Sequence, residues 1–521
     1  MALYQTLSAS PASIVAANAI IAFGLLQGHT ISTADAVKAY LQSWLQSHAA
    51  TWVRLPKEVW PAEWFGADGR PKYRRPVIRL WRSLYGHPEA GSHWERHLEK
   101  ELLAMSATKI SEFPSTYIFD NYGGLALIVY VDDFVLAGDS EWHSRFWEDL
   151  SKRVIIDEVG DIGRFLGRHH ATVKCEGQER FAFDMRSYAK DMIQEYVQLT
   201  GMPNFKKAHT PFLSKVAEKL EEEEPIGRLS SLASSILMKL MWISRLARPD
   251  LLRATTWLAT KIHAWTASCD GHIHRVISYL HQTQDSLLTG WIRDPKETLY
   301  LEMFVDADFC GDEDHCFSTS GGWIQISGPD SQFPLAWISK KQGAIARSTT
   351  EAETAAMAYV LFEEGLPLLE LMKRLLSPNV KLRVREDNEA SAKVVTAGYS
   401  KRLRHMKRTH KINIASIAAE LSKDDLELML VNTLHQKGDL FTKAVAGPLW
   451  SNAMKLIALI EEYEIIKTSS AGLKMTGTED ISLEQAIGPE QDAVAVPRAQ
   501  AFKKRKKRKP QRVPQFLQAD D

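Results

Sequence analysis

The stretch from Leu125 to Gly138, with the sequence LALIVYVDDFVLAG, constrains the fold of this chain more than any other. Mostly branched apolar residues lead up to Asp132 and Asp133, and the chain turns apolar again at Phe134. This pattern predicts two buried strands joined by a tight Asp132-Asp133 turn. Adjacent carboxylates repel each other and lose hydration beside apolar strands, which favours a bound cation such as Mg²⁺ or Mn²⁺. A surface hairpin that merely carries two aspartates at its turn is the alternative.

The four residues from Tyr130 to Asp133 resemble the catalytic hairpin of reverse transcriptases. Ordered motifs extend the resemblance to the Pol polyprotein of copia-type (Pseudoviridae-like) LTR retrotransposons, in its reverse transcriptase plus ribonuclease H region. The resemblance implies an α+β fold, with a reverse-transcriptase palm and thumb followed by a ribonuclease H-like α/β domain. It also implies that Asp132 and Asp133 are catalytic metal ligands and that Tyr130 contacts the substrate.

Asp35 permits two interpretations. An isolated aspartate ahead of a helical pattern is usually an N-cap. In copia-type polymerases, however, Ala, an aromatic residue and Leu stand four, five and six residues after the first metal-binding aspartate. Residues 39–41 match that spacing from Asp35. The resemblance implies that Asp35 is the third catalytic carboxylate and metal ligand of the polymerase. It implies further that Tyr40 is the steric gate that excludes a ribose 2′-OH.

A Ser-Leu-Tyr-Gly stretch at residues 83–86 also resembles the copia-type family. Trp94, Leu98 and Leu102 follow at the spacing of an amphipathic helix. The family signature has Gln where this chain has Glu89. The resemblance implies that this position contacts the incoming nucleotide, where an anionic Glu89 would face a triphosphate.

The second half of the chain carries a separate set of acids, placed beside predicted strands and at the start of a predicted helix. The pattern predicts strands at 301–308, 336–339, 380–384 and 426–431 and a helix at 351–361. Strands and helices in this order bring several carboxylates to one end of a mixed sheet. Each acid taken alone is more often a helix cap or a surface charge.

These motifs resemble the ribonuclease H domain of copia-type elements, in which Asp-Ala-Asp, Ser-Thr-Glu-Ala-Glu, Asp-Asn and Ala-Asp-x-x-Thr-Lys occur in that order. The resemblance implies four catalytic metal ligands: Asp306, Glu353, Asp387 and Asp439. Glu353 is preferred to Glu351 because the family has Ala three residues after the ligand, as at Ala356. Gly438 stands where the family usually has Ala.

Basic residues cluster further along the chain, with His405 and His410 among them. The candidates for substrate binding are Lys401, Arg402, Arg404, Lys407 and Arg408. One interpretation is a solvated helix or loop. The other is a surface that contacts the phosphate backbone of an RNA/DNA hybrid.

The composition is that of a globular protein, with 45% hydrophobic and 25% charged residues. The apolar segment from Ile14 to Leu26 is too short to span a bilayer, so it predicts a buried helix and no membrane anchor. The four cysteines lack metal-binding spacing, which indicates a reducing, intracellular setting. The segment after about 469 is predicted to be disordered, and its basic run at 503–509 indicates either a nuclear-localisation signal or a nonspecific nucleic-acid contact. The expected location is a cytoplasmic particle, the nucleus or both.

Together with these patterns, the resemblance implies four regions. They are an N-terminally truncated reverse-transcriptase fingers and palm at 1–200, a thumb- or connection-like helical region at 201–295, a ribonuclease H-like domain at 296–468 and a disordered basic tail at 469–521. The resemblance implies an RNA-directed DNA polymerase with ribonuclease H activity, using two Mg²⁺ or Mn²⁺ ions per active site. RNA template, DNA primer, RNA/DNA hybrid and dNTPs are the expected partners, and the oligomeric state is left open. The alternative is a truncated or domesticated relic that binds nucleic acid, with nuclease activity only or with no catalysis.

Overall fold

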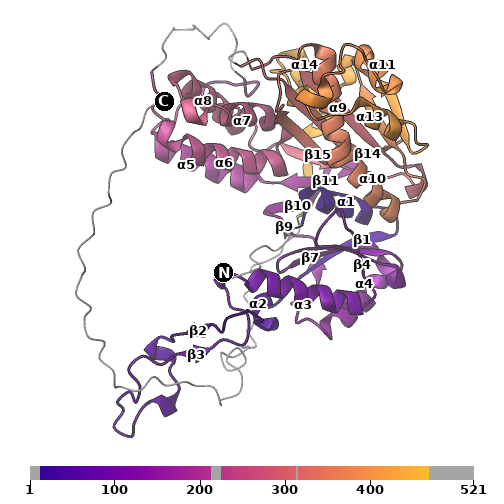
Figure 1. The fold of residues 1–521 in the computed structure, drawn as a ribbon. Helices are drawn as coiled ribbons and strands as arrows, with labels where there is room; N and C mark the ends of the chain where they lie inside the picture. The colour runs from indigo at the N-terminus through magenta and orange to yellow at the C-terminus, as the bar shows by residue number, and fades with distance from the viewer. Residues whose placement is uncertain (1–11, 213–224, 313–314, 469–521) are drawn as a thin grey trace, which may run out of the picture. The chain divides into compact units, whose positions relative to one another are not determined.

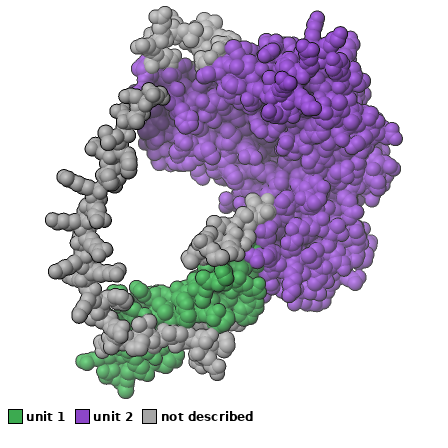
Figure 2. All heavy atoms as spheres, in the orientation of Figure 1, with its two compact units in different colours: residues 1–7, 40–94, 477–521 green, residues 8–39, 95–476 purple. Residues whose placement is uncertain are grey.

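The computed structural model describes residues 12–212, 225–312 and 315–468 (Figure 1). The predicted disordered tail, with its basic run at 503–509, lies outside the described residues. The described chain divides into two compact units (Figure 2). One unit comprises residues 40–94, and the other comprises residues 12–39 and the described part of 95–468. The bounds of the four predicted regions stay a prediction.

The unit of residues 40–94 has little regular structure. Its sheet has two short antiparallel strands, β2 (Trp52–Val53) and β3 (Ile78–Arg79). Helix α2 (Ala39–Gln42) begins at its N-terminal boundary, and α3 (Ala90–Ala104) begins near its C-terminal boundary. The predicted amphipathic helix is confirmed, because Trp94, Leu98 and Leu102 are buried along α3.

The first large sheet of the other unit is antiparallel, with the strand order β4-β5-β6-β7-β1-β8. Its strands are β1 (His29–Asp35), β4 (Thr108–Lys109), β5 (Thr116–Phe119), β6 (Leu125–Tyr130), β7 (Asp133–Asp139) and β8 (Gly160–Asp161). Helix α1 (Ile14–Gly24) packs against Ile31, and α4 (Ser140–Ser151) bonds Ser32 through Trp147. Because neighbouring residues of a strand face opposite ways, the two helices cover opposite faces of β1. Covered faces explain why β6 and β7 are apolar without alternation.

Helix α1 confirms the predicted buried helix, since every residue from Ala16 to Gly24 is buried. Its one polar side chain, Asn18, donates to the carbonyl of Leu335 at 2.8 Å and accepts from the Arg168 guanidinium. No helix within residues 12–212, 225–312 and 315–468 has both the length and the apolar character needed to cross a membrane.

A second sheet has the order β18-β12-β11-β10-β19, with β9 paired to β10. Its strands are β9 (Arg164–Phe165), β10 (Arg168–Cys175), β11 (Gln178–Asp184), β12 (Leu287–Gly290), β18 (Leu459–Ile460) and β19 (Glu464–Thr468). Helices α5 (Arg186–Thr200), α6 (Ser230–Leu246), α7 (Leu252–Ala259) and α8 (Ala267–Gln282) lie between β11 and β12 in the chain and gather beside one another (Figure 1).

The third sheet has the order β15-β14-β13-β16-β17, and it is mixed as predicted. Its strands are β13 (Tyr300–Asp308), β14 (Thr319–Gly328), β15 (Ser331–Lys341), β16 (Leu382–Glu386) and β17 (Leu426–Leu430). The first three pair antiparallel, and β13, β16 and β17 run parallel. The accompanying helices are α9 (Thr349–Val360), α10 (Leu366–Leu375), α11 (Glu389–Ala397), α12 (Met406–Thr409), α13 (Ile414–Leu421) and α14 (Pro448–Leu456). The predicted strands and the predicted helix at 351–361 are therefore confirmed.

Candidate active sites

The first candidate site lies where β1 ends and β7 begins. Asp35 and Asp133 are direct cross-strand partners, and the amide of Ala36 donates to the carbonyl of Asp132 at 2.8 Å. The sheet therefore brings Asp35 to the adjacent pair Asp132 and Asp133, which lie far from it in the sequence. Asp35 is the last residue of a strand, so the N-cap interpretation is wrong.

The hairpin differs from its prediction by one residue. Tyr130 pairs with Asp133, which is already the first residue of β7, so the turn consists of Val131 and Asp132. The predicted Asp132-Asp133 turn is wrong because the pairing of β6 with β7 continues one residue further than the apolar pattern does. Val131 has φ of +59°, a conformation that costs a β-branched residue about 1–3 kcal/mol. This turn leaves Asp133 in register with Asp35.

A fourth carboxylate, Asp157, was missed by the sequence analysis. Its Oδ1 accepts the amide hydrogen of Asp35 at 2.6 Å. Burial, followed by the charges of Asp157 and Asp132, raises the pKa of Asp35. Burial, followed by the charges of Asp35 and Asp132, raises the pKa of Asp133 to about 7. Asp157 follows the apolar run 154–156, and this is the only sequence feature that could have indicated it.

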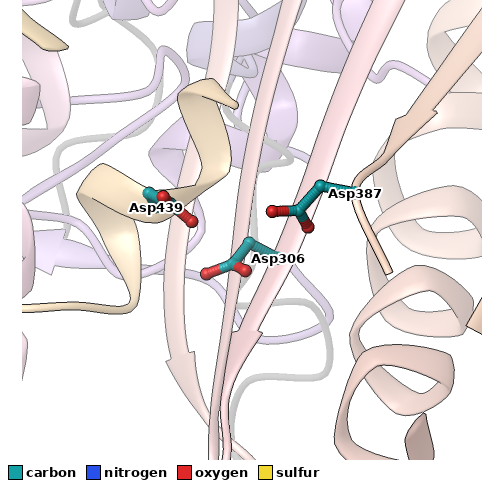
Figure 3. A group of neighbouring side chains, drawn as sticks. All are labelled: Asp306, Asp387 and Asp439. Atoms are coloured by element: carbon teal, nitrogen blue, oxygen red, sulfur yellow. The ribbon is translucent and has the colours of Figure 1, made fainter. Parts of the chain in front are cut away.

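The second candidate site lies at one end of the third sheet. Asp306 is in β13, Asp387 follows β16, and Asp439 is in the short 3₁₀ helix η10 (Lys437–Phe441). The three carboxylates face a common space (Figure 3), and one oxygen from each lies within 4.8 Å of the others. Glu353 of α9 and Glu386, the last residue of β16, form a second such group with Asp387. Glu386 directly precedes Asp387 and was not among the residues selected from the sequence.

Burial and like charge dominate the electrostatics of this second cluster. The pKa of Glu353 rises to about 10, from burial first and then from the charges of Asp306 and Glu386. Burial is also the main reason that the pKa of Glu386 rises to about 8 and that of Asp439 to about 7. Within the described chain, Oε2 of Glu353 and Oε2 of Glu386 are buried without a hydrogen-bond partner. Crowded carboxylates with unpaired buried oxygens are a donor set that fits Mg²⁺ or Mn²⁺.

Two glycines let η10 approach these acids. A Cβ on Gly438 would lie 2.9 Å from Cβ of Asp306, and a Cβ on Gly321 would lie 2.5 Å from Cγ2 of Thr442. Gly321 is the strand partner of Asp306 in β14. The departure from the family at Gly438 therefore has a steric reason in this chain.

Glu351 lies outside the second cluster although it is close in sequence. Its carboxylate is fully buried, and its oxygens lie 3.0 Å from Nε2 of His405 and Nε2 of His410. It also accepts the amide hydrogen of Arg347 at 3.0 Å. The structure thus brings Glu353, and not Glu351, to the other acids.

The basic segment after residue 400 packs against α9 through its apolar side chains and its histidines. Leu403 and Met406 are buried in a small core with Ala355, and the two histidines face Glu351. The five predicted substrate-binding cations are all exposed; they are Lys401, Arg402, Arg404, Lys407 and Arg408. This arrangement leaves both interpretations of the segment open.

The other predicted substrate-binding residues are Tyr40, Glu89 and Tyr130. Tyr40 and Glu89 belong to the unit of residues 40–94. The Tyr40 ring packs on the ring of Tyr85 with centroids 4.6 Å apart. Glu89 is only 5% exposed, and its Oε2 lies 4.0 Å from Nε2 of His93. Tyr130 ends β6 and packs, half-buried, against the main core.

Comparison with known proteins confirms the resemblance found from the motifs. The chain is 27% identical over 406 residues to the retrovirus-related Pol polyprotein from transposon RE2 of Arabidopsis thaliana, covering 75% of this chain and 26% of that protein. It is 26% identical to the corresponding polyprotein from transposon TNT 1-94 of Nicotiana tabacum, covering 74% and 28%. These are polyproteins of copia-type transposons. The chain thus spans about a quarter of the length of the curated relatives it matches.

Comparison with protein-family models and with solved structures assigns no family or fold to the chain. No family model matches the chain. The LC11 ribonuclease H1 isolated from compost covers 27% of this chain and 92% of its own, with a TM-score of 0.20 and 16% identity. A likeness this slight supports no fold assignment by itself.

Proposed function

We propose that this chain, a relative of the Pol polyproteins of copia-type retrotransposons, is their reverse transcriptase and ribonuclease H portion. The first sheet would be the polymerase palm, helices α5 to α8 the thumb or connection, and the third sheet the ribonuclease H-like domain. One observation carries the proposal: two separate carboxylate clusters lie at strand ends in two different sheets. Two chemistries on one template, synthesis and removal of the copied RNA, require two such sites.

At the first site, Asp35 and Asp132 would hold the catalytic cations and Asp133 would support them. When bound, two divalent cations stabilise the attacking and leaving oxygens of a phosphoryl transfer. The chain itself sets the distance between the acids through the pairing of Asp35 with Asp133. The resemblance gives Tyr40 the role of excluding ribonucleotides and gives Tyr130 and Glu89 the role of substrate contacts.

At the second site, Asp306, Glu353, Asp387 and Asp439 would hold the cations, with Glu386 beside them. Divalent cations would supply the same charge stabilisation to hydrolysis of the RNA strand. The exposed cations of residues 401–408 would contact the phosphate backbone of an RNA/DNA hybrid. The RNA 2′-OH would then distinguish the strand to be cut.

The experiment that tests both sites measures primer extension on an RNA template and cleavage of an RNA/DNA hybrid in Mg²⁺. Asp132→Asn should abolish extension and spare cleavage, and Asp387→Asn should do the reverse. Each variant is the control for the other, because both remove one negative charge. Loss of both activities in either variant, with the protein folded, would contradict two independent sites.

One observation favours a second candidate, a relic that retains only the nuclease. Within the described chain, both groups of acids whose oxygens are close enough to share a cation belong to the third sheet. If the chain is such a relic, the wild-type protein cleaves an RNA/DNA hybrid but does not extend a primer. Extension that disappears in Asp132→Asn would exclude it.

A further inference from the structure

Lys443 contacts the second cluster from the end of η10. Its Nζ lies 3.0 Å from Oδ1 of Asp306 and 2.6 Å from Oδ1 of Asp439. Both acids belong to the group of three whose oxygens converge within 4.8 Å. One ammonium therefore pairs with two of the three carboxylates that this group offers to a cation.

The backbone next to Lys443 is anchored to the sheet. The Thr442 hydroxyl donates to Oδ2 of Asp306, and the Thr442 carbonyl accepts from Nε of Arg253 at 2.7 Å. Arg253 also pairs with Oδ2 of Asp308 at 3.1 Å, and both side chains are nearly buried. This pair ties the chain at residue 442 to the end of β13.

The Lys443 side chain is less constrained than its backbone. It is 43% exposed, whereas the Asp306 side chain that it contacts is 1% exposed. Four methylene groups allow the ammonium to rotate into water without moving the anchored backbone, and rotation restores its hydration. The Asp306 carboxylate has no such freedom, since Asp306 lies in β13, which pairs with β14 on one side and with β16 on the other.

We propose that Lys443 is an internal competitor of the divalent cation, a positioning residue that pairs with Asp306 and Asp439 until a metal ion displaces its ammonium towards solvent. The inference rests on the proposed nuclease site. Two positive groups that share the same carboxylates repel each other, so each weakens the binding of the other. Lys443 would therefore hold the acids in place while lowering the affinity of the site for metal.

The test is a calorimetric titration of the full chain with Mn²⁺. Lys443→Met should bind Mn²⁺ about fivefold more tightly, the upper end of what a partly exposed ion pair contributes. Lys443→Gln should behave in the same way if the methionine variant does not fold, and Lys443→Arg should stay close to wild type. Lys373→Met is the matched control, because Lys373 also pairs with two carboxylates, those of Glu370 and Asp425, beside the start of β16 and not beside its end, and it should leave the affinity unchanged.

A second measurement separates competition from a plain structural role. Without metal, Lys443→Met should unfold at a lower temperature than wild type, and saturating Mn²⁺ should remove most of the difference. Unchanged or weaker Mn²⁺ binding by both neutral variants would overturn the inference. The heat of binding assigned to this cluster is the part that Asp306→Asn abolishes. If Asp306→Asn binds Mn²⁺ like wild type, the proposed metal site itself fails, and the inference fails with it.

Discussion

Replacing Glu386 by glutamine should stabilise the metal-free protein at alkaline pH and leave its stability unchanged at acidic pH. Glu386 is completely buried at the end of β16. Its Oε1 accepts the amide hydrogen of Asn388 at 3.0 Å, and its Oε2 has no hydrogen-bond partner within the described chain. Glutamine has nearly the same shape and can accept the same hydrogen bond, so the substitution removes little besides the ionisable charge.

The magnitude follows from the pKa of Glu386, which rises from 4.5 to about 8, mainly through burial. The folded state holds the proton on the Glu386 carboxyl more tightly than the unfolded state does. The protonated carboxyl therefore contributes its full stabilisation of the folded state below about pH 4.5. That stability is lost as the pH rises towards about 8. At about 1.4 kcal/mol per pKa unit, the ceiling of the loss is about 5 kcal/mol. Glutamine does not ionise, so the variant escapes this loss.

The assay is thermal unfolding in chelator at about pH 4 and pH 8.5, together with hydrogen exchange of the β16 amides, which reports opening of this strand alone. The variant should exceed wild type in stability at the higher pH only. Saturating Mn²⁺ should reduce or reverse the stability advantage of the variant over wild type, because the ionised Glu386 of the wild type then faces a cation.

Glu351→Gln is the matched control. Glu351 is equally buried but is bonded to His405, His410 and the Arg347 amide, so its replacement should destabilise the protein at both pH values. A Glu386→Gln variant that is equally destabilised at both pH values would refute the argument that an unpaired buried charge dominates this position.

Three further predictions concern packing, pairing and pH. Arg253→Met leaves Asp308 largely buried without its ion-pair partner and should cost about 3–5 kcal/mol in unfolding free energy, with partial recovery in Arg253→Lys. Gly438→Ala places a methyl group 2.9 Å from Cβ of Asp306 and should cost about 1–3 kcal/mol while lowering hybrid cleavage. Because burial raises the pKa of Asp133 to about 7, primer extension at limiting Mg²⁺ should increase between about pH 6 and pH 8 as this carboxyl ionises. A flat profile would contradict the last of these.

The sequence by itself predicted the elements that depend on local pattern. The apolar run before Asp132 predicted the strands of the hairpin, and the apolar segment after Ile14 predicted a buried helix. The alternation of strands, helices and acids predicted a mixed sheet with carboxylates at one end, where Asp306, Asp387 and Asp439 meet. Such patterns are visible in sequence because each strand or helix must bury its own apolar face.

The tertiary structure decided which neighbours those acids have. It placed Asp157 against the amide of Asp35, brought Glu386 beside Glu353, and set Lys443 between two carboxylates. It also shifted the hairpin turn by one residue through the pairing of Tyr130 with Asp133. These features depend on contacts between distant segments and on burial, which raises the cost of each charge according to what surrounds it. No local pattern carries that information, because the same glutamate is a surface charge or a crowded buried acid depending on the chain that packs over it.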